Sequence, residues 1–362
     1  MVGAGPAGSA CALALAQDDV DGVALLDAGA RPGRPPIGES IPPDTRLLLD
    51  RLGVVDEFLR EGHEPCLGSS SAWGSDQLGF NDFVLNPHGP GWHLDRARFD
   101  DLLRRRAVDA GAVLVEGARL EGVTVDGPWH RLHLAGGRTT RARFVVDATG
   151  RASAFARAVG ARQVPLDRLT VVYGWFDTRE AAGVRSRLTL LEAERRGWWY
   201  AAELPGDRLA VALATDADLA RADGLTHEAA WLAAAHGPPH LASRLEGCRL
   251  VAGPTPVVAR SFLLDPGSGP GWVAIGDAAA AFDPIAAQGI HKALDDGIAA
   301  AEAIAAARGR DAEVTAGPAR RIRAGFDEYL ANRNHFYGLE RRWPDAPFWQ
   351  RRQARVDLPA TG

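Results

Sequence analysis

The feature that most constrains the fold lies at the start of the chain, where a glycine-rich turn leads into a helical pattern. The segment Gly3-Ala4-Gly5-Pro6-Ala7-Gly8 matches G-x-G-x-x-G, and the Ala- and Leu-rich residues 6–17 predict a helix. In this turn Gly3 allows the tight bend, Gly5 lets the backbone approach a pyrophosphate, and Gly8 lets the helix pack on its strand. The helix N-terminus at Pro6 and Ala7 then presents a partial positive charge to the phosphates. The pattern predicts a dinucleotide-binding α/β unit, the alternative being a chance glycine-rich turn.

An acidic residue follows the next predicted strand. The short apolar run Val23-Ala24-Leu25-Leu26 predicts a buried strand, and it ends at Asp27. There the carboxylate can accept hydrogen bonds from ribose hydroxyls, whereas it would repel a 2′-phosphate. The site is therefore expected to suit FAD or NAD better than NADP. The alternative for Asp27 is a solvated loop acid.

Only two residues, Met1 and Val2, precede the glycine turn, although a buried strand normally comes before it. Either this first strand is very short, or the natural start lies upstream. We expect the second case, with the first strand missing from the sequence.

A second pattern lies far downstream. The apolar run Trp272-Val273-Ala274-Ile275 leads into Gly276-Asp277, and the loop Asp283-Pro284-Ile285 then leads through Gln288-Gly289-Ile290 into an Ala-rich helical pattern. Together the two patterns resemble the FAD motifs of the aromatic hydroxylase and flavin-dependent halogenase superfamily, which has a glutathione-reductase-like fold. The resemblance implies that Asp277 binds the ribityl chain. It also implies that the isoalloxazine ring lies beside Pro284, Gln288, Gly289 and Ile290.

Three shorter segments extend this resemblance. Arg96 begins a segment similar to the family's R-x-x-[FL]-x-x-x-L helix, whose arginine reaches toward FAD. Asp147-Ala148-Thr149-Gly150 resembles the D-x-x-G segment near the pyrophosphate. The stretch containing Glu39 and Ser40 resembles the G-E-S-x-x-P stretch of halogenase-like and tryptophylquinone-maturation flavoproteins. The resemblance implies cofactor contacts for Glu39, Ser40, Arg96, Asp147 and Gly150.

Segments of two kinds alternate along the chain. Helical and parallel-strand patterns occupy residues 1–65, 95–162 and 271–310, which we assign to a discontinuous FAD-binding domain. Short aromatic-bearing strands occupy residues 66–94 and 163–270, and residues 311–362 predict a helical tail. We therefore expect an α/β (α+β) fold: a Rossmann-like FAD-binding domain, an inserted antiparallel sheet for the substrate, and a helical C-terminal tail.

Aromatic residues on the inserted strands indicate a substrate cavity between this sheet and the flavin, and we expect Trp73, Trp198 and Tyr200 to line it. The segment around Trp198 loosely resembles the W-x-W-x-x-P strand of halogenases. Many pyrrole and phenol halogenases carry K-x-G, four residues and W-G, with a lysine that activates hypochlorous acid. Here the lysine position holds Cys66, and the only lysine of the chain, Lys292, lies elsewhere. Halogenation is therefore disfavoured.

The resemblance implies an FAD-dependent monooxygenase that hydroxylates an indole- or phenol-type ring through a flavin C4a-hydroperoxide. No catalytic residue is assigned, because the flavin carries the chemistry while the protein positions the substrate and excludes water. Three alternatives stay open: an FADH2-dependent halogenase, a flavin-dependent reductase of isoprenoid type, and a non-catalytic flavin-binding maturation partner.

Partners follow from the same resemblance. The tail resembles those of maturation flavoproteins that hydroxylate a tryptophan in a partner polypeptide. The substrate is thus a small aromatic molecule or an aromatic side chain of a carrier-bound or protein substrate. No second dinucleotide motif is present, so reducing equivalents are expected from transiently bound NAD(P)H or from a separate flavin reductase.

Composition excludes other classes. The 362 residues suffice for two modest domains, and the formal net charge of −5 offers no basic surplus for nucleic acid. No apolar run reaches the ~20 residues of a membrane span, and no signal peptide is evident, so we expect a cytoplasmic protein. The three cysteines are far apart and the histidines are scattered, which predicts neither disulfides nor a metal site.

Overall fold

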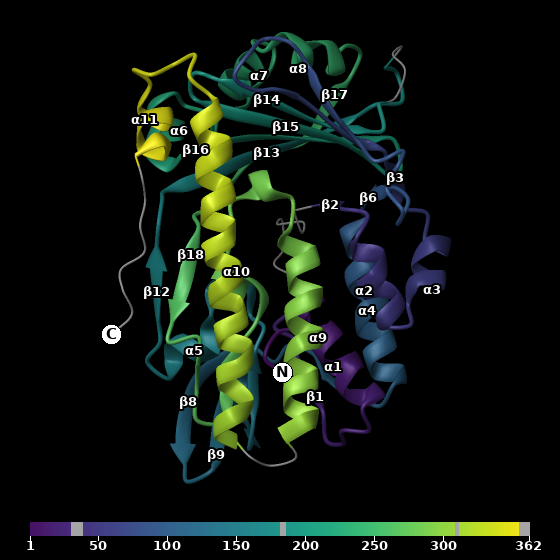
Figure 1. The fold of residues 1–362 in the computed structure, drawn as a ribbon, viewed down its shortest axis with the longest axis vertical. Helices are drawn as coiled ribbons and strands as arrows, with labels where there is room; N and C mark the ends of the chain where they lie inside the picture. Colours follow the sequence, from purple (N-terminus) through teal and green to yellow (C-terminus); the bar gives the residue numbers. More distant parts are fainter. Residues whose placement is uncertain (30–38, 182–185, 308–310, 355–362) are drawn as a thin grey trace.

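The computed structural model describes residues 1–29, 39–181, 186–307 and 311–354. Figure 1 shows two parts along the long axis: a large sheet with short helices on its far side, and a mixed helix-and-strand part below it. A long helix near the C-terminus, α10 (Asp311–Leu339), runs beside both parts. The α/β (α+β) architecture predicted from the sequence is confirmed.

A parallel sheet lies at the centre of the lower part. From one edge to the other its strands are β7 (Val113–Val115), β1 (Ala24–Leu26), β11 (Val145–Asp147), β20 (Trp272–Ala274) and an antiparallel edge strand, β19 (Ser268–Gly269). Val2 joins β1 to β11, because it forms parallel bridges with Leu26 and with Asp147. The first residues of the chain thus hold the strand position that we expected to be missing.

Helices α1 (Pro6–Gln17), α4 (Arg96–Asp109) and α9 (Gly289–Ala307) share a hydrophobic core with this sheet. The helix predicted over residues 6–17 is confirmed. Helices α1 and α9 lie very close together, since a Cβ on Gly297 would lie 2.6 Å from the carbonyl oxygen of Ala7.

Two short helices follow β2, namely α2 (Thr45–Arg51) and α3 (Val55–Arg60). Gly53 lies between them with φ +66°, a left-handed conformation that ends the first helix.

The large sheet has seven strands. Their order is β17 (Arg249–Val258), β13 (Leu169–Asp177), β16 (Arg208–Asp216), β15 (Gly197–Leu204), β14 (Leu188–Glu194), β4 (Gly68–Ala72) and β5 (Gly79–Asp82). Five of the neighbouring pairs are antiparallel, but β4 and β14 are parallel. The sheet is therefore mixed, which corrects the expectation of a purely antiparallel one.

The two faces of this sheet have different neighbours. The outer face is covered by α6 (Ala217–Ala222), α7 (Glu228–Ala235) and α8 (Pro239–Arg244). Helices α7 and α8 are separated at Gly237-Pro238, because proline restricts the residue before it. The inner face carries Trp175 and Trp198 and faces the α/β part and the tail.

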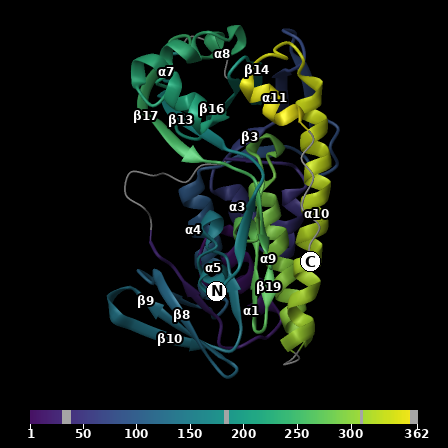
Figure 2. The same ribbon diagram turned by 90° about the vertical axis from the view of Figure 1, so that its left-hand side faces the viewer.

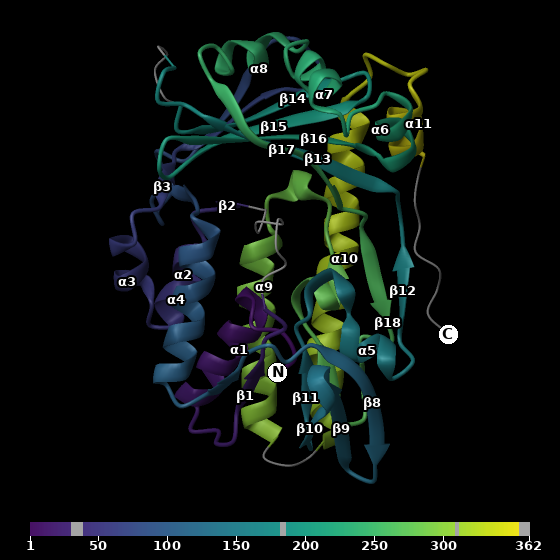
Figure 3. The ribbon, with the colours of Figure 1, turned by 180° about the vertical axis from the view of Figure 1, so that it is seen from behind.

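Three small sheets surround these parts. They are β8 (Leu120–Asp126), β9 (Trp129–Leu134) and β10 (Arg138–Ala142), then β12 (Arg162–Pro165), β18 (Phe262–Asp265) and β21 (Ala280–Ala281), and finally β2 (Ser40–Ile41), β6 (Gly91–His93) and β3 (Glu64–Cys66). Figure 2 shows β8–β10 projecting at the end away from the large sheet. Figure 3 shows β12 and β18 running between the two parts. The short helix α5 (Ala154–Ala158) follows β11.

The tail forms two helices. Helix α10 packs along α9 and reaches the large sheet, where α11 (Pro347–Gln353) follows after a turn containing Trp343 and Pro344. The two helices are separate at this turn, because a proline in the interior of a helix disfavours its continuation. Among the described residues, no helix is long and apolar enough to cross a membrane.

Candidate functional site

Four chain segments leave the parallel sheet at one edge. Because β1, Val2, β11 and β20 run parallel and in register, their carboxyl ends meet where α/β sheets usually bind ligands. The residues that follow these ends are Asp27, Gly3, Ala148 and the Gly276-Asp277 pair. The structure thus brings the two distant sequence patterns to one edge.

The three glycines of the first turn differ in their surroundings. Gly3 has φ +105°, and a Cβ there would lie 2.3 Å from the carbonyl oxygen of Ala148. A Cβ on Gly8 would lie 2.0 Å from the carbonyl oxygen of Gly3, so both positions require glycine for packing. A Cβ on Gly5, the N-cap of α1, would meet nothing within 4 Å. The N-terminus of α1, with Pro6 as its first residue, is therefore open to a phosphate group.

The second pattern packs directly against the first. Gly276 has φ +58°, and a Cβ there would lie 2.9 Å from the Cβ of Ala7. Lys292 of α9 donates to the carbonyl oxygen of Gly276 at 2.8 Å. The carboxylate of Asp296 accepts from the backbone N–H of Gly276 at 3.0 Å. One lysine–aspartate pair on α9 therefore fixes the turn that presents Asp277.

Asp277 and Asp27 are both accessible at this edge. The Asp277 side chain is 37% exposed and lies 3.8 Å from the guanidinium of Arg151. Burial lowers the pKa of Arg151, and the charge of Asp277 opposes this shift. Asp27 accepts from the N–H of Gly29 at 3.1 Å and pairs with Arg104 at 3.6 Å. Both carboxylates can therefore meet sugar hydroxyls.

Asp147 lies at the end of β11, in the turn that leads to Gly150. It is fully buried, and its carboxylate accepts from Thr149 N at 3.0 Å, Thr149 Oγ1 at 2.7 Å and Ala156 N at 2.8 Å. Burial raises the pKa of Asp147, and these hydrogen bonds oppose the rise. Asp147 shapes the turn toward Gly150, where φ is +60°, and its carboxylate is held by its own chain.

Residues 283–290, which we call the flavin loop because the resemblance implies a flavin ring beside them, lie between α9 and the inner face of the large sheet (Figure 1). Pro284 starts a 3-10 turn, and Ile285 packs against the hydrophobic cluster of the sheet. Gln288 and Gly289 are exposed, whereas Ile290 is buried. As predicted, α9 begins at Gly289, so its N-terminus can stabilise negative charge near the loop.

The inner face of the sheet meets Glu39, Ser40 and Arg96. The Tyr200 hydroxyl lies 2.8 Å from Ser40 Oγ, and burial, followed by the charge of Glu39, raises the pKa of Tyr200 well above its usual range. Burial and Glu39 also raise the pKa of Tyr173, while Arg96 opposes this rise. Sequence reasoning missed Tyr173, because no motif distinguishes it from the other residues of a buried strand.

Arg96 is the first residue of α4, whose N-cap Asp95 accepts from two backbone N–H groups. Its guanidinium pairs with Asp100 at 3.1 Å and is 12% exposed. Arg96 also lies near Tyr173 of the large sheet, and its reach toward FAD stays a prediction.

Trp73 and Trp198 lie next to the tail. Trp198 is buried and donates to the Tyr337 hydroxyl at 3.0 Å, while Trp73 donates to the carbonyl oxygen of Phe336 at 2.7 Å. The Trp73 ring also contacts Trp349 at 5.4 Å between centroids. Of the three aromatic residues predicted to line a substrate cavity, only Tyr200 contacts the segment before α2.

The position where halogenases carry a lysine holds a buried thiol. Cys66 Sγ donates to Gly68 O at 3.2 Å and lies 3.7 Å from Thr189 Oγ1. Thr189 also bonds His93 Nε2 at 2.9 Å, and burial lowers the pKa of His93 to about 4. His93 is therefore neutral at neutral pH, and the neighbouring cation is the guanidinium of Arg244, which donates to Ser186 Oγ at 2.9 Å and to Ser70 Oγ at 3.5 Å. Among the described residues, no group of His, Cys, Asp or Glu could hold a metal ion.

Comparison with known proteins agrees with this geometry. Residues 76–361 match the tryptophan halogenase family. The putative FAD-dependent oxidoreductase LodB of Marinomonas mediterranea is 27% identical over 98% of this chain and 96% of its own length.

Two solved structures share the fold. The myxobacterial chondrochloren halogenase CndH superimposes with a TM-score of 0.87 at 26% identity, covering 97% of this chain and 84% of that one. The peptidyl tryptophan dihydroxylase QhpG superimposes with a TM-score of 0.77 at 24% identity, covering 99% and 79%. The chain therefore belongs to the tryptophan halogenase family, whose members are flavin-dependent enzymes.

Proposed function

We propose that this protein binds FAD along the carboxyl edge of its parallel sheet and transfers an oxygen atom to an electron-rich aromatic ring. The pyrophosphate would lie at Gly5 and the N-terminus of α1, with sugar and ribityl hydroxyls at Asp27 and Asp277. The open space at Gly5 supports this placement, because Gly3 and Gly8 are required by packing whereas Gly5 is not.

One observation favours oxygen transfer over halogenation: no lysine stands where the resemblance to halogenases places one, next to the large sheet. Cys66 stands at the corresponding position, and its thiol is engaged with Gly68. The only lysine of the chain, Lys292, is 9% exposed and paired with Asp296 at 2.8 Å. The ammonium group of Lys292 bonds the carbonyl oxygen of Gly276 and the carboxylate of Asp296. It is therefore not available to activate a hypohalous acid.

The protein groups would bind, orient and exclude water. When bound, reduced FAD supplies the activation of dioxygen. Tyr200, with Tyr173 in the same cluster, would contact an indole or phenol ring, since aromatic side chains bury apolar area and still present polar edges. The N-terminus of α9 would stabilise negative charge on the reduced ring system.

Halogenation is the second candidate, because the family match and the likeness to CndH favour it. It would require another group to replace the lysine. The substrate of either reaction is proposed to be a small aromatic molecule or an aromatic side chain on a carrier or partner protein. Reducing equivalents would come from NAD(P)H or a flavin reductase.

The test uses the purified protein with chemically reduced FAD, dioxygen and a panel of indoles, phenols and tryptophan-containing peptides, with and without chloride or bromide. Oxygen transfer predicts products that gain one oxygen atom whether or not halide is present. Products in which hydrogen is replaced by chlorine or bromine would establish the second candidate instead. Turnover without dioxygen would indicate a reductase, and flavin reoxidation with no product would indicate a non-catalytic partner.

A further inference from the structure

Asp283 begins the flavin loop and lies at the centre of a buried polar network. Its side chain is fully buried, and Oδ1 accepts from the N–H of Ile285 at 3.0 Å, which holds the 3-10 turn of the loop. Its other oxygen accepts from the Tyr337 hydroxyl at 2.8 Å and lies 3.7 Å from Arg333 Nε. Both of these partners come from α10, so the tail holds the carboxylate.

The backbone of Asp283 is held by the same helix. Its N–H donates to the Tyr329 hydroxyl at 2.9 Å, and that hydroxyl lies 2.7 Å from Ser261 Oγ. Residues 329, 333 and 337 are four apart, so they project from one face of α10. One face of a helix far from the FAD motifs in sequence therefore contacts the loop through three side chains.

Tyr337 connects the loop to the large sheet. Its hydroxyl donates to Asp283 and accepts from Trp198 Nε1 at 3.0 Å. Arg333 likewise reaches Asp167, the residue two before β13, at 3.3 Å. The flavin loop, the large sheet and the tail thus share one hydrogen-bond network. Each side chain named in it is at most 9% exposed.

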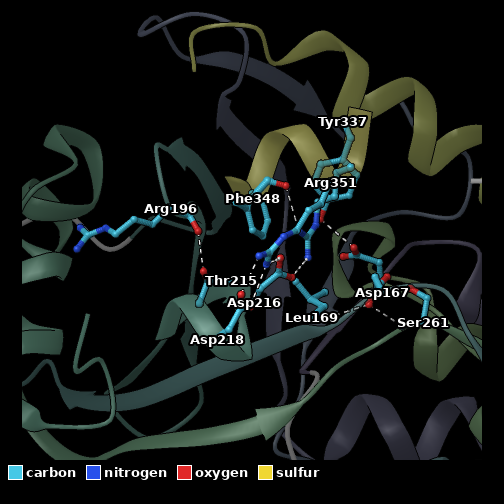
Figure 4. Close-up of polar contacts among 12 residues, drawn as sticks. Asp167, Leu169, Arg196, Thr215, Asp216, Asp218, Ser261, Tyr337, Phe348 and Arg351 are labelled. Atoms are coloured by element: carbon cyan, nitrogen blue, oxygen red, sulfur yellow. Dashed lines mark hydrogen bonds and ion pairs between the residues drawn. The ribbon is translucent and has the colours of Figure 1, made fainter. Parts of the chain in front are cut away.

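The tail is anchored beyond this network. Figure 4 shows Tyr337 and Phe348 of the tail beside Asp167 and Asp216 at the large sheet. Arg352 of α11 pairs with Asp216 at 2.7 Å, and its guanidinium lies 3.6 Å from the Phe348 ring centroid. Helix α10 is therefore fixed at its C-terminal end, where Tyr337 lies.

We propose that helix α10 positions the flavin loop through Tyr329, Arg333 and Tyr337 acting on Asp283, and that this contact sets the affinity for flavin; the second part rests on the proposed FAD binding. A buried carboxylate that loses one donor keeps its desolvation cost without the compensating bond. The loop would then relax away from the geometry in which it can lie beside a flavin ring.

The experiment compares Tyr337→Phe, which removes a single hydroxyl, with Phe336→Leu, which alters a half-exposed neighbour whose ring contacts His335. Hydrogen exchange of the loop amides is measured first, without FAD. FAD affinity is then measured by calorimetry, and the midpoint potential of bound flavin by dye equilibration. Tyr337→Phe is expected to speed exchange at Ile285 and weaken FAD binding about tenfold, with a shifted potential, while Phe336→Leu matches the wild type.

Unchanged loop exchange, or unchanged affinity and potential, in folded Tyr337→Phe would overturn the proposal. If Tyr337→Phe does not fold, Tyr329→Phe provides the same comparison, because it removes the acceptor of the Asp283 N–H. If the wild type binds no FAD, the proposed function fails. The exchange measurement without FAD still decides whether α10 holds the loop.

Discussion

Lys292 and Gly276 form a direct hydrogen bond, with the lysine Nζ 2.8 Å from the glycine carbonyl oxygen. Asp296, one helical turn further along α9, pairs with Lys292 and accepts the N–H of the same glycine. A single i,i+4 pair thus satisfies both backbone groups of the residue before Asp277. This explains why the chain's only lysine is engaged in holding the second FAD pattern.

Replacing Lys292 by Met is expected to destabilise the protein by about 3 kcal/mol, because it leaves Asp296 as a buried charge without its partner. Urea unfolding monitored by tryptophan fluorescence measures this change. The double variant Lys292→Met with Asp296→Leu removes both charges and should recover part of the loss. Equal stability of the wild type and Lys292→Met would show that the pair does not hold the turn.

The contribution of two buried histidines to stability is expected to fall as the pH drops from 6.5 toward 4. Burial lowers the pKa of both His63 and His93 from the usual 6.5 to about 4. The unfolded chain therefore binds protons in this window that the folded chain does not. Each histidine then removes about 1.4 kcal/mol of stability per pH unit, and the contribution is fully present above pH 6.5.

The variant His93→Gln isolates this effect, since a glutamine amide can still bond the Thr189 hydroxyl but does not titrate. Urea unfolding of wild type and variant at several pH values provides the comparison. The variant should lose less stability on acidification. Parallel pH profiles would mean that His93 titrates normally in the folded protein.

The sequence predicted the local structure around the two glycine patterns well, because its signals are local. The glycine turn, the helix over residues 6–17 and the start of α9 at Gly289 each depend on a few neighbouring residues. The expected strand before Gly3 was harder to assess, because Val2 pairs with two strands that lie far along the chain.

The surroundings of the aromatic residues on the large sheet could not be predicted, because they depend on contacts between distant segments of the chain. The tail lies against Trp73 and Trp198 through residues more than a hundred positions later in the chain. The Cys66–Thr189–His93 cluster likewise joins three separate segments. The bonds of the buried Asp147 carboxylate to Thr149 and Ala156 are likewise visible only in the structure, whereas its predicted place near the cofactor stays a prediction.

Tyr200 and Trp198 should respond differently to substitution. Tyr200→Phe removes a hydroxyl that bonds Ser40 at the boundary with the FAD-type sheet, so KM for the aromatic substrate should rise. Trp198→Phe removes a buried donor to Tyr337 and leaves a small cavity, so its main effect should be a stability loss of about 2 kcal/mol. Steady-state kinetics and urea unfolding of both variants test this. Unchanged turnover and substrate affinity in Tyr200→Ala and Trp198→Ala would remove both residues from the substrate site.

Gly8 and Gly5 provide a matched pair for the first turn. Gly8→Ala should destabilise the protein without any ligand, because its Cβ would lie 2.0 Å from the carbonyl oxygen of Gly3. Gly5→Ala should leave the ligand-free protein as stable as the wild type, since its Cβ meets nothing within 4 Å. Thermal unfolding without FAD checks both expectations, and a folded Gly8→Ala of wild-type stability would contradict the packing role of Gly8.

The most direct test of FAD binding at this edge is calorimetric titration of FAD into the wild type and Gly5→Ala. The account predicts one equivalent of FAD bound by the wild type, and affinity at least about tenfold weaker in the equally stable variant, because the added methyl group occupies the space of the pyrophosphate. A wild type that binds no FAD, or a variant that binds it equally well, would contradict it.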